Sequence, residues 1–221
     1  MAGTWPADGA VANVMVVGVG GQGVIMAAAI VAEAALLHGG LDVKLSETRG
    51  MSQRGGSVHS HIRIGERVVA PSISPGEVDY LLAFEAAEGL RFSPSVVAGG
   101  VAIVNTQRIV PPLASLGTHA YPHDAIERMA TGDRTVIAVD GNAVGEEIGD
   151  VKVAGVVLVG ALAAFLPFAT ETWRRAIAAN VPPRWLDMNL AAFAAGRRIG
   201  AEAGAPHGAP ASAPSRGGGR S

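Results

Sequence analysis

One stretch constrains this chain more than any other: VMVVGVGGQGVIMAAAIVAEAALLHGG, residues 14–40. A short apolar run leads into a cluster of glycines, and an alanine-rich segment follows that stops at Gly39-Gly40. The pattern predicts a buried strand over residues 11–17, a tight turn, and a helix over residues 24–38 that a glycine ends. With a second apolar strand at residues 41–46, the sequence predicts a βαβ unit, which belongs to the α/β class.

The rest of the chain continues to alternate between strand and helix patterns. In residues 58–64, Val58, Ile62 and Ile64 share one face, while His59, His61 and Arg63 share the other, as in a half-exposed strand. Gly65-Glu66 resembles a two-residue hairpin turn leading into RVVAP. Further strands are expected at 78–84, 101–105 and 135–139, helices at 85–91 and 121–130, and helical structure from 151 to 203, broken at Pro167 and Pro182-Pro183.

Together these elements predict an α/β fold: a Rossmann-like, doubly wound, mostly parallel sheet with an antiparallel hairpin insertion and a helical C-terminus. We expect residues 1–11 to be a flexible N-terminus and residues 12–203 to form one domain. Residues 204–221 are rich in Gly, Pro, Ala and Ser and lack apolar periodicity, so we expect a disordered tail.

Composition limits the classes of function. The formal net charge of −2 provides no basic surface for nucleic acid. The chain has no cysteine, so it cannot hold a thiolate zinc site or an ordinary iron–sulfur cluster. The N-terminus has no pattern of a secretory signal, which favours a cytoplasmic protein. An uncharged run at residues 153–169 approaches the length of a membrane span, but it is short and ends near Pro167, so a buried helix is the favoured interpretation.

Gly18, Gly20 and Gly23 fit the GxGxxG spacing between a strand and a helix. Such a turn lets the backbone approach a ligand, and the free N–H groups of the helix start attract an anion. Binding of a dinucleotide also needs an acidic side chain at the end of the second strand, where Glu47 is a candidate. The alternative is that the glycines only let the helix pack closely on the strand.

The segment SETRGMSQRGGS, residues 46–57, combines Arg49 and Arg54 with several glycines. The guanidinium group of arginine binds carboxylate or phosphate through two hydrogen bonds, and arginine is also favoured in protein interfaces. This loop is therefore the second candidate for ligand contact.

Four motifs, in order and spacing, carry a resemblance to a known family: GVGGQG, SETRGMSQRGGSVHSHIRIG, VDYLLAFEAAEGLR and VPPRWLDMNLAAFAAG. Over roughly residues 12–200 the chain resembles the beta subunits of indolepyruvate ferredoxin oxidoreductases and, more broadly, the gamma-type domain of the 2-oxoacid:ferredoxin oxidoreductases. The resemblance implies a large alpha subunit that binds thiamine diphosphate, Mg and 4Fe-4S clusters, with ferredoxin as the acceptor. It also implies oxidative decarboxylation of an aryl-2-oxoacid with coenzyme A.

The sequence contains no obvious site for thiamine diphosphate, and we expect no catalytic residue and no metal ligand on this chain. The residues expected to contact coenzyme A or the active-site cleft are those of the glycine turn and of the loop, namely Gly18, Gly20, Gly21, Gln22, Gly23, Arg49, Arg54, Gly55 and Gly56. Two rival functions remain at this point: a free-standing NAD(P)- or flavin-dependent dehydrogenase, and a nucleotide-binding regulatory module.

Three further groups of residues have both a functional and an ordinary interpretation. His59 and His61 could bind a metal, but without a third ligand nearby an exposed or interface position is favoured. Glu85 and Glu88 follow a strand, where α/β proteins place functional groups, but at a helix start acidic side chains also favour the positive end of the helix dipole, and this second interpretation is preferred. The aromatic residues of the last helices, Trp173, Trp185 and Phe193, could dock a partner, and packing in the core is the default.

Overall fold

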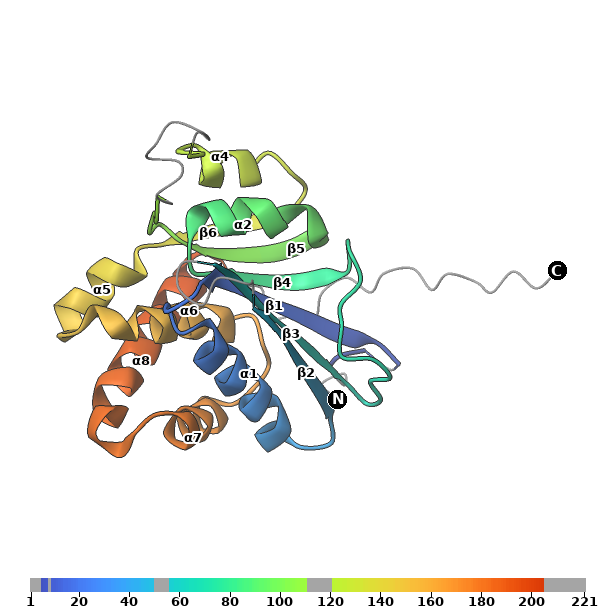
Figure 1. Ribbon diagram of the computed structural model, residues 1–221. Helices are drawn as coiled ribbons and strands as arrows, with labels where there is room; N and C mark the ends of the chain where they lie inside the picture. Colours follow the sequence, from blue (N-terminus) through green and yellow to red (C-terminus); the bar gives the residue numbers. More distant parts are fainter. Residues whose placement is uncertain (1–4, 8, 50–55, 111–120, 205–221) are drawn as a thin grey trace.

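The computed structural model describes residues 5–7, 9–49, 56–110 and 121–204, with only the backbone described for Arg49. The predicted segments at Arg54, at Gly55 and beyond residue 204 therefore lie outside the described residues. Six strands form one sheet in the order β2-β3-β1-β4-β5-β6 (Figure 1). They are β1 (Val11–Val19), β2 (Asp42–Arg49), β3 (Ser57–Gly65), β4 (Val78–Ala83), β5 (Val96–Asn105) and β6 (Thr135–Val139).

The sheet is parallel on one side of β1 and antiparallel on the other. Strands β1, β4, β5 and β6 run parallel, whereas β3 is antiparallel to both β1 and β2. The predicted β1-α1-β2 crossover exists, but β3 lies between its two strands. The mixed α/β class is thus confirmed, and β2 with β3 supplies its antiparallel part.

The predicted hairpin at Gly65-Glu66 is wrong. Residues 66–77 contain no strand, and β4 begins only at Val78. The reason is that both edges of β3 are already paired, with β1 on one side and β2 on the other. The RVVAP segment has no free edge to join, and the chain crosses instead to the parallel half of the sheet.

Helices cover both faces of the sheet. The first face carries α1 (Val24–His38), α6 (Ala154–Ala163), α7 (Thr170–Asn180) and α8 (Leu186–Glu202), and the second carries α2 (Ala86–Phe92) and α4 (Ala125–Met129) (Figure 1). Two groups of buried side chains follow from this layering. The larger lies under α1 and α6, and the smaller lies between the sheet and α2.

Helix α6 explains the uncharged run near residue 160. All ten of its residues are buried, because it lies between the sheet and α8. Close approach to α8 depends on small residues: a Cβ at Gly196 would lie 1.9 Å from the Val157 carbonyl oxygen, and one at Gly200 would lie 2.4 Å from that of Ala161. Among the described residues, no helix has the length and apolar character that crossing a bilayer demands.

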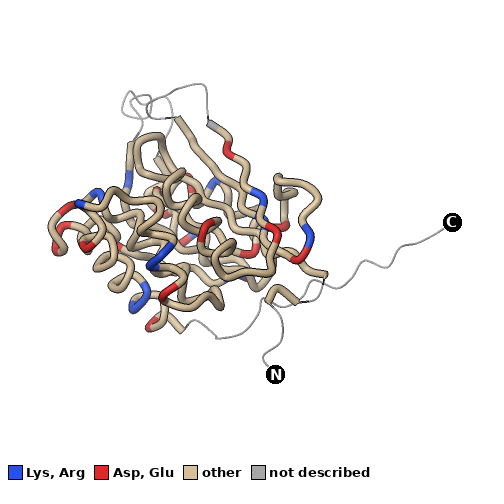
Figure 2. The backbone as a smooth tube through the Cα atoms, turned by 90° about the horizontal axis from the view of Figure 1, so that it is seen from below, with Lys and Arg blue, Asp and Glu red and all other residues tan. Residues whose placement is uncertain are grey.

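The C-terminal helical part begins earlier than the sequence indicates. Helix α5 (Gly141–Ile148) precedes it, with Asp140 at its N-cap accepting a hydrogen bond from the Ala143 N–H at 3.0 Å. Charged residues of both signs are interspersed along the described chain (Figure 2). This distribution accords with the small net charge of −2.

Candidate functional site

The glycine turn connects the end of β1 to the start of α1 at the carboxyl edge of the parallel strands. Gly21 and Gly23 have positive φ angles of 100° and 88°, which only glycine adopts without strain. Gly18 serves another purpose: a Cβ there would lie 2.8 Å from that of Phe84 and 2.9 Å from a methyl group of Val24. Gly18 thus lets the helix and β4 approach the strand, while the other two glycines shape the turn.

Gln22 has a structural role that its position in the motif did not reveal. Its side-chain oxygen accepts a hydrogen bond from the Val19 N–H at 2.7 Å. Its amide nitrogen donates to the Phe84 carbonyl oxygen at 3.0 Å and to the Gln107 side-chain oxygen at 2.8 Å. The Gln22 side chain therefore ties the turn to the ends of β4 and β5, and its amide N–H groups are engaged within the protein.

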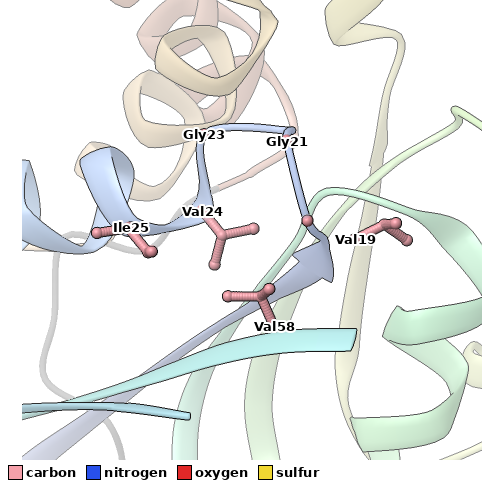
Figure 3. A pocket seen from close by; sticks show the side chains of 7 residues that line it. Val19, Gly21, Gly23, Val24, Ile25 and Val58 are labelled. Atoms are coloured by element: carbon pink, nitrogen blue, oxygen red, sulfur yellow. The ribbon is translucent and has the colours of Figure 1, made fainter. Parts of the chain in front are cut away.

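A cavity of about 300 Å³ opens beside the turn (Figure 3). Its lining combines glycine backbone with apolar side chains: Val19, Gly20, Gly21, Gly23, Val24, Ile25 and Val58. Figure 3 shows the side chains of Val24 and Val58 facing one another below the turn. The cavity offers apolar walls and exposed backbone near the helix start.

The start of α1 is a source of free hydrogen-bond donors. Its N-cap, Gly23, provides no side chain for capping, and the first turn has no acidic residue. Within the described part of the chain, the N–H groups of Val24, Ile25 and Met26 have no acceptor, whereas Ala27 N–H already bonds to the Gly23 carbonyl at 3.0 Å. Such donors, together with the helix dipole, favour an anion.

The segment predicted as a loop is partly strand, since residues 46–49 belong to β2 and Ser57 to β3, and its described C-terminal end meets the glycine turn. The Gly20 N–H donates to the Gly56 carbonyl oxygen at 2.9 Å, and Val19 pairs with Ser57. Arg49 is the last residue of β2 and pairs with Val58, so its backbone lies at the same edge of the sheet. The structure thereby brings Gly18, Gly20, Gly21, Gln22, Gly23 and Gly56 to one edge, with the backbone of Arg49 beside them.

The dinucleotide interpretation conflicts with the strand order. Glu47 lies on β2, and β3 separates β2 from the glycine turn. Two strand spacings put Glu47 roughly 10 Å from the strand that carries the turn. In a dinucleotide site the acidic residue stands on the strand adjacent to the turn, and here that position belongs to Val58 on β3.

Two glutamates after β4 anchor the second wall of this edge. Glu85 is buried, caps α2 by accepting from the Glu88 N–H at 2.9 Å, and also accepts from the Ile109 N–H at 3.2 Å and from the Tyr121 hydroxyl. Burial and the Glu85 carboxylate raise the pKa of Tyr121 above its ordinary value. Glu85 and Glu88 do lie at the start of α2, as predicted, but the capping by Glu85 and its contact with Tyr121 could not be read from the sequence.

Glu88 connects α2 to the edge where the loop rejoins the sheet. It accepts a hydrogen bond from the Ser57 hydroxyl and lies 3.5 Å from the Arg91 guanidinium. Ser57 is the first residue of β3 and pairs with Val19 beside the glycine turn. This contact joins the helix on the second face to the strand that borders the cavity.

His59 and His61 lie side by side on β3, with ring centroids 5.3 Å apart. His61 Nδ1 accepts a hydrogen bond from the Ile73 N–H at 2.9 Å, and the His59 ring packs against Phe92 with centroids 5.1 Å apart. Burial lowers the pKa of both imidazoles, with Arg91 contributing at His59 and His59 contributing at His61. Among the described residues no group of three His, Asp or Glu side chains could hold a metal ion.

These observations define a small α/β domain with a cavity of about 300 Å³ at the carboxyl edge of its sheet. The family model described as pyruvate ferredoxin/flavodoxin oxidoreductase matches residues 13–199. The chain therefore belongs to this family, and the resemblance that its motifs carry is confirmed. It is a subunit of a 2-oxoacid:ferredoxin oxidoreductase, an enzyme of several subunits.

Individual relatives are similar over most of their length. The indolepyruvate oxidoreductase subunit IorB of Archaeoglobus fulgidus is 39% identical over 188 residues, covering 83% of this chain and 92% of that protein. The subunit of the same name from Methanothermobacter thermautotrophicus is 40% identical over 199 residues, covering 86% of this chain and 98% of that protein. Among solved structures, the gamma subunit of a keto/oxoacid ferredoxin oxidoreductase from Geobacter sulfurreducens PCA superposes with a TM-score of 0.66 at 26% identity, covering 86% of this chain and 99% of that one.

Proposed function

We propose that this chain is the small subunit of an enzyme that oxidises an arylpyruvate such as indolepyruvate. One 2-oxoacid, one coenzyme A thiol and two oxidised ferredoxins give one aryl-acetyl-CoA, one CO2, one proton and two reduced ferredoxins. The observation that carries the proposal is the identity of 39–40% to two indolepyruvate oxidoreductase subunits over nearly their whole length. The substrate assignment follows from those relatives, whereas the role of the subunit follows from its own residues.

We assign the redox cofactors to a large partner subunit. This chain has no cysteine to hold an iron–sulfur cluster, and its described residues include no acidic or histidine triad for a metal. When bound to the partner, thiamine diphosphate acts as the electron sink for decarboxylation, and the clusters carry electrons singly. This chain contributes shape and hydrogen-bond donors.

The glycine-turn cavity is the part of this chain that we assign to substrate contact. The N–H groups of Val24, Ile25 and Met26 suit a phosphate group of coenzyme A or a 2-oxoacid carboxylate, and Val19 and Val58 supply apolar walls. We propose that Arg49, at the end of β2, and Arg54, five residues later in the sequence, add positive charge to the same anion site.

The reaction is tested by mixing the purified chain with its co-purified large subunit. Reduction of ferredoxin that requires indolepyruvate, coenzyme A and both polypeptides supports the proposal. Turnover of NAD or NADP by the isolated chain, or a flavin bound to it, would establish the dehydrogenase instead. A nucleotide that binds the isolated chain without turnover would favour a regulatory module.

The two arginines are tested in the assembled enzyme. We expect Arg49→Ala with Arg54→Ala to raise the KM for coenzyme A or the 2-oxoacid about 10- to 100-fold, since a charge-assisted hydrogen bond contributes about 1.5–3 kcal/mol. Arg198→Ala is the matched control, because Arg198 is 72% exposed near the end of α8. Unchanged kinetics in a fully assembled double variant would refute the assignment.

A further inference from the structure

A second cavity borders the start of α1, where Met26 forms part of its lining. Its volume is about 320 Å³, and we call it the Trp185 pocket. Met26, Val153, Val181, Pro182, Trp185 and Met188 make its apolar lining, while Asp150, Lys152, Arg184 and Asn189 add polar groups. Most of these residues come from the connection after α5 and from the segment that joins α7 to α8.

The exposure of Trp185 separates it from the other aromatic residues of the last helices. Trp173 is fully buried and Phe193 is 2% exposed, so both pack in the core as expected. Trp185 is 42% exposed, and Val151 beside the pocket is 40% exposed. Covering Trp185 and the apolar side chains beside it would remove apolar area from water, which suits an interaction surface.

The charges at the pocket favour an acidic occupant. The Arg184 guanidinium lies 5.6 Å from the centroid of the Trp185 ring, and it forms no ion pair with the residues that the structure describes. Asp150 is already engaged, since one carboxylate oxygen accepts from the Lys152 N–H at 2.9 Å and the other lies 3.7 Å from the Lys152 ammonium. A positive charge stacked on an exposed aromatic ring is an arrangement that protein interfaces favour.

The position of the pocket connects it to the proposed substrate cavity. Met26 lines the Trp185 pocket, and Ile25, one residue earlier on α1, lines the glycine-turn cavity. Met188 also reaches toward Gly149, where a Cβ would lie 3.6 Å from its terminal methyl group. A protein seated on the Trp185 pocket would therefore stand beside the glycine turn.

We propose that the Trp185 pocket is a docking site for the large partner subunit, which inserts an apolar side chain flanked by a carboxylate. The apolar side chain fills the space between Trp185 and Met188, and the carboxylate pairs with Arg184. Methionine side chains adapt to the shape of such an insertion. The proposal depends on the proposed function only for the identity of the partner.

The test measures the affinity of the full chain for the large subunit. We expect Trp185→Ala to raise the Kd about 30-fold or more, as loss of a central tryptophan does in other interfaces. Arg184→Glu should raise the Kd about tenfold or more and weaken its dependence on salt. The controls are Arg198→Glu, which makes the same charge change on an exposed part of α8, and Leu36→Ala, which removes another exposed apolar side chain. Both controls should stay within about twofold of the parent.

Circular dichroism of each isolated variant establishes that it is folded before binding is measured. Wild-type affinity in folded Trp185→Ala and Arg184→Glu would overturn the proposal. A second result would also overturn it: the isolated chain forms a dimer, and Trp185→Ala dissociates that dimer but leaves binding of the large subunit unchanged. The occupant of the pocket would then be a second copy of this chain. Saturable quenching of the Trp185 fluorescence by indolepyruvate, measured on the isolated chain, would show instead that the pocket binds a small acid. A wild-type complex that assembles through this pocket but oxidises no 2-oxoacid would remove the proposed function and leave the docking site intact.

Discussion

The side chain of Asp79 allows a quantitative prediction about stability. It stands at the start of β4, where its Oδ2 accepts a hydrogen bond from the Asn13 N–H at 2.8 Å. Burial raises the pKa of Asp79 from 3.8 to about 6. The hydrogen bond from Asn13 lowers this pKa, and the nearby charge of Glu77 raises it further. The folded protein therefore prefers the protonated carboxyl, and ionisation of Asp79 at neutral pH costs stability.

The magnitude follows from this difference in pKa. One pKa unit corresponds to about 1.4 kcal/mol, so the cost at neutral pH is about 3 kcal/mol. It is absent below pH 3.8, grows as the pH rises toward 6, and is complete above that value. Asp79→Asn removes the charge and keeps an oxygen that can accept from Asn13. We expect the substitution to raise the free energy of unfolding by about 2–3 kcal/mol at pH 7.5 and by less than about 1 kcal/mol at pH 4.

Urea unfolding followed by circular dichroism at pH 4, 6 and 7.5 measures this difference. Asp133→Asn is the control, because Asp133 is exposed and no side-chain hydrogen bond of it is found in the described structure. A loss of stability on Asp79→Asn at pH 7.5, or a gain that does not change between pH 4 and 7.5, would refute the reasoning.

Two substitutions examine how the sheet edge and the helical layer are held together. Gly196→Ala puts a methyl group 1.9 Å from the Val157 carbonyl oxygen, so α8 must move away from α6. We expect the free energy of unfolding to fall by about 3 kcal/mol or more, which lowers the Tm. The control Ala201→Gly, at an exposed position of α8, should lower it by about 1 kcal/mol. A Tm for Gly196→Ala equal to that of the Ala201→Gly control would contradict this packing. Gln22→Glu keeps the shape of the side chain but replaces its N–H donors with a carboxylate oxygen, which then faces the acceptor oxygens of Phe84 and Gln107. We therefore expect the free energy of unfolding, measured in urea, to fall by about 2–4 kcal/mol. A fully stable Gln22→Glu protein that had lost only substrate affinity would restore Gln22 to a ligand role.

Much of the fold could be predicted because its signals are local. Apolar runs and glycine boundaries located β1, α1, β4 and β6 to within a few residues, and the strand–turn–helix context placed the glycine turn correctly. Glu85 and Glu88 lie at the start of a helix, as their position after a strand predicts. The predictions that failed include the hairpin at Gly65-Glu66, which depends on strand pairing, and the start of the C-terminal helical part, where α5 was not expected.

The candidate site was predicted only in part, for the same reason. The spacing of Gly21 and Gly23 indicates a turn that needs positive φ, whereas the three partners of Gln22 lie 3, 62 and 85 residues away. The position of β3 between β1 and β2, which separates Glu47 from the turn, is likewise not indicated by any local sequence pattern.

The sequence by itself determined the class of this protein, the glycine turn and the family, because each depends on residue types at short, regular spacing. Only the tertiary structure decided which strand borders the turn, which glycines serve packing, and why Trp185 is exposed while Trp173 is buried. Two tryptophans on successive amphipathic segments look alike in a sequence. Their burial is decided by which neighbours α6, α7 and α8 bring to them, and those contacts form between residues far apart in the chain.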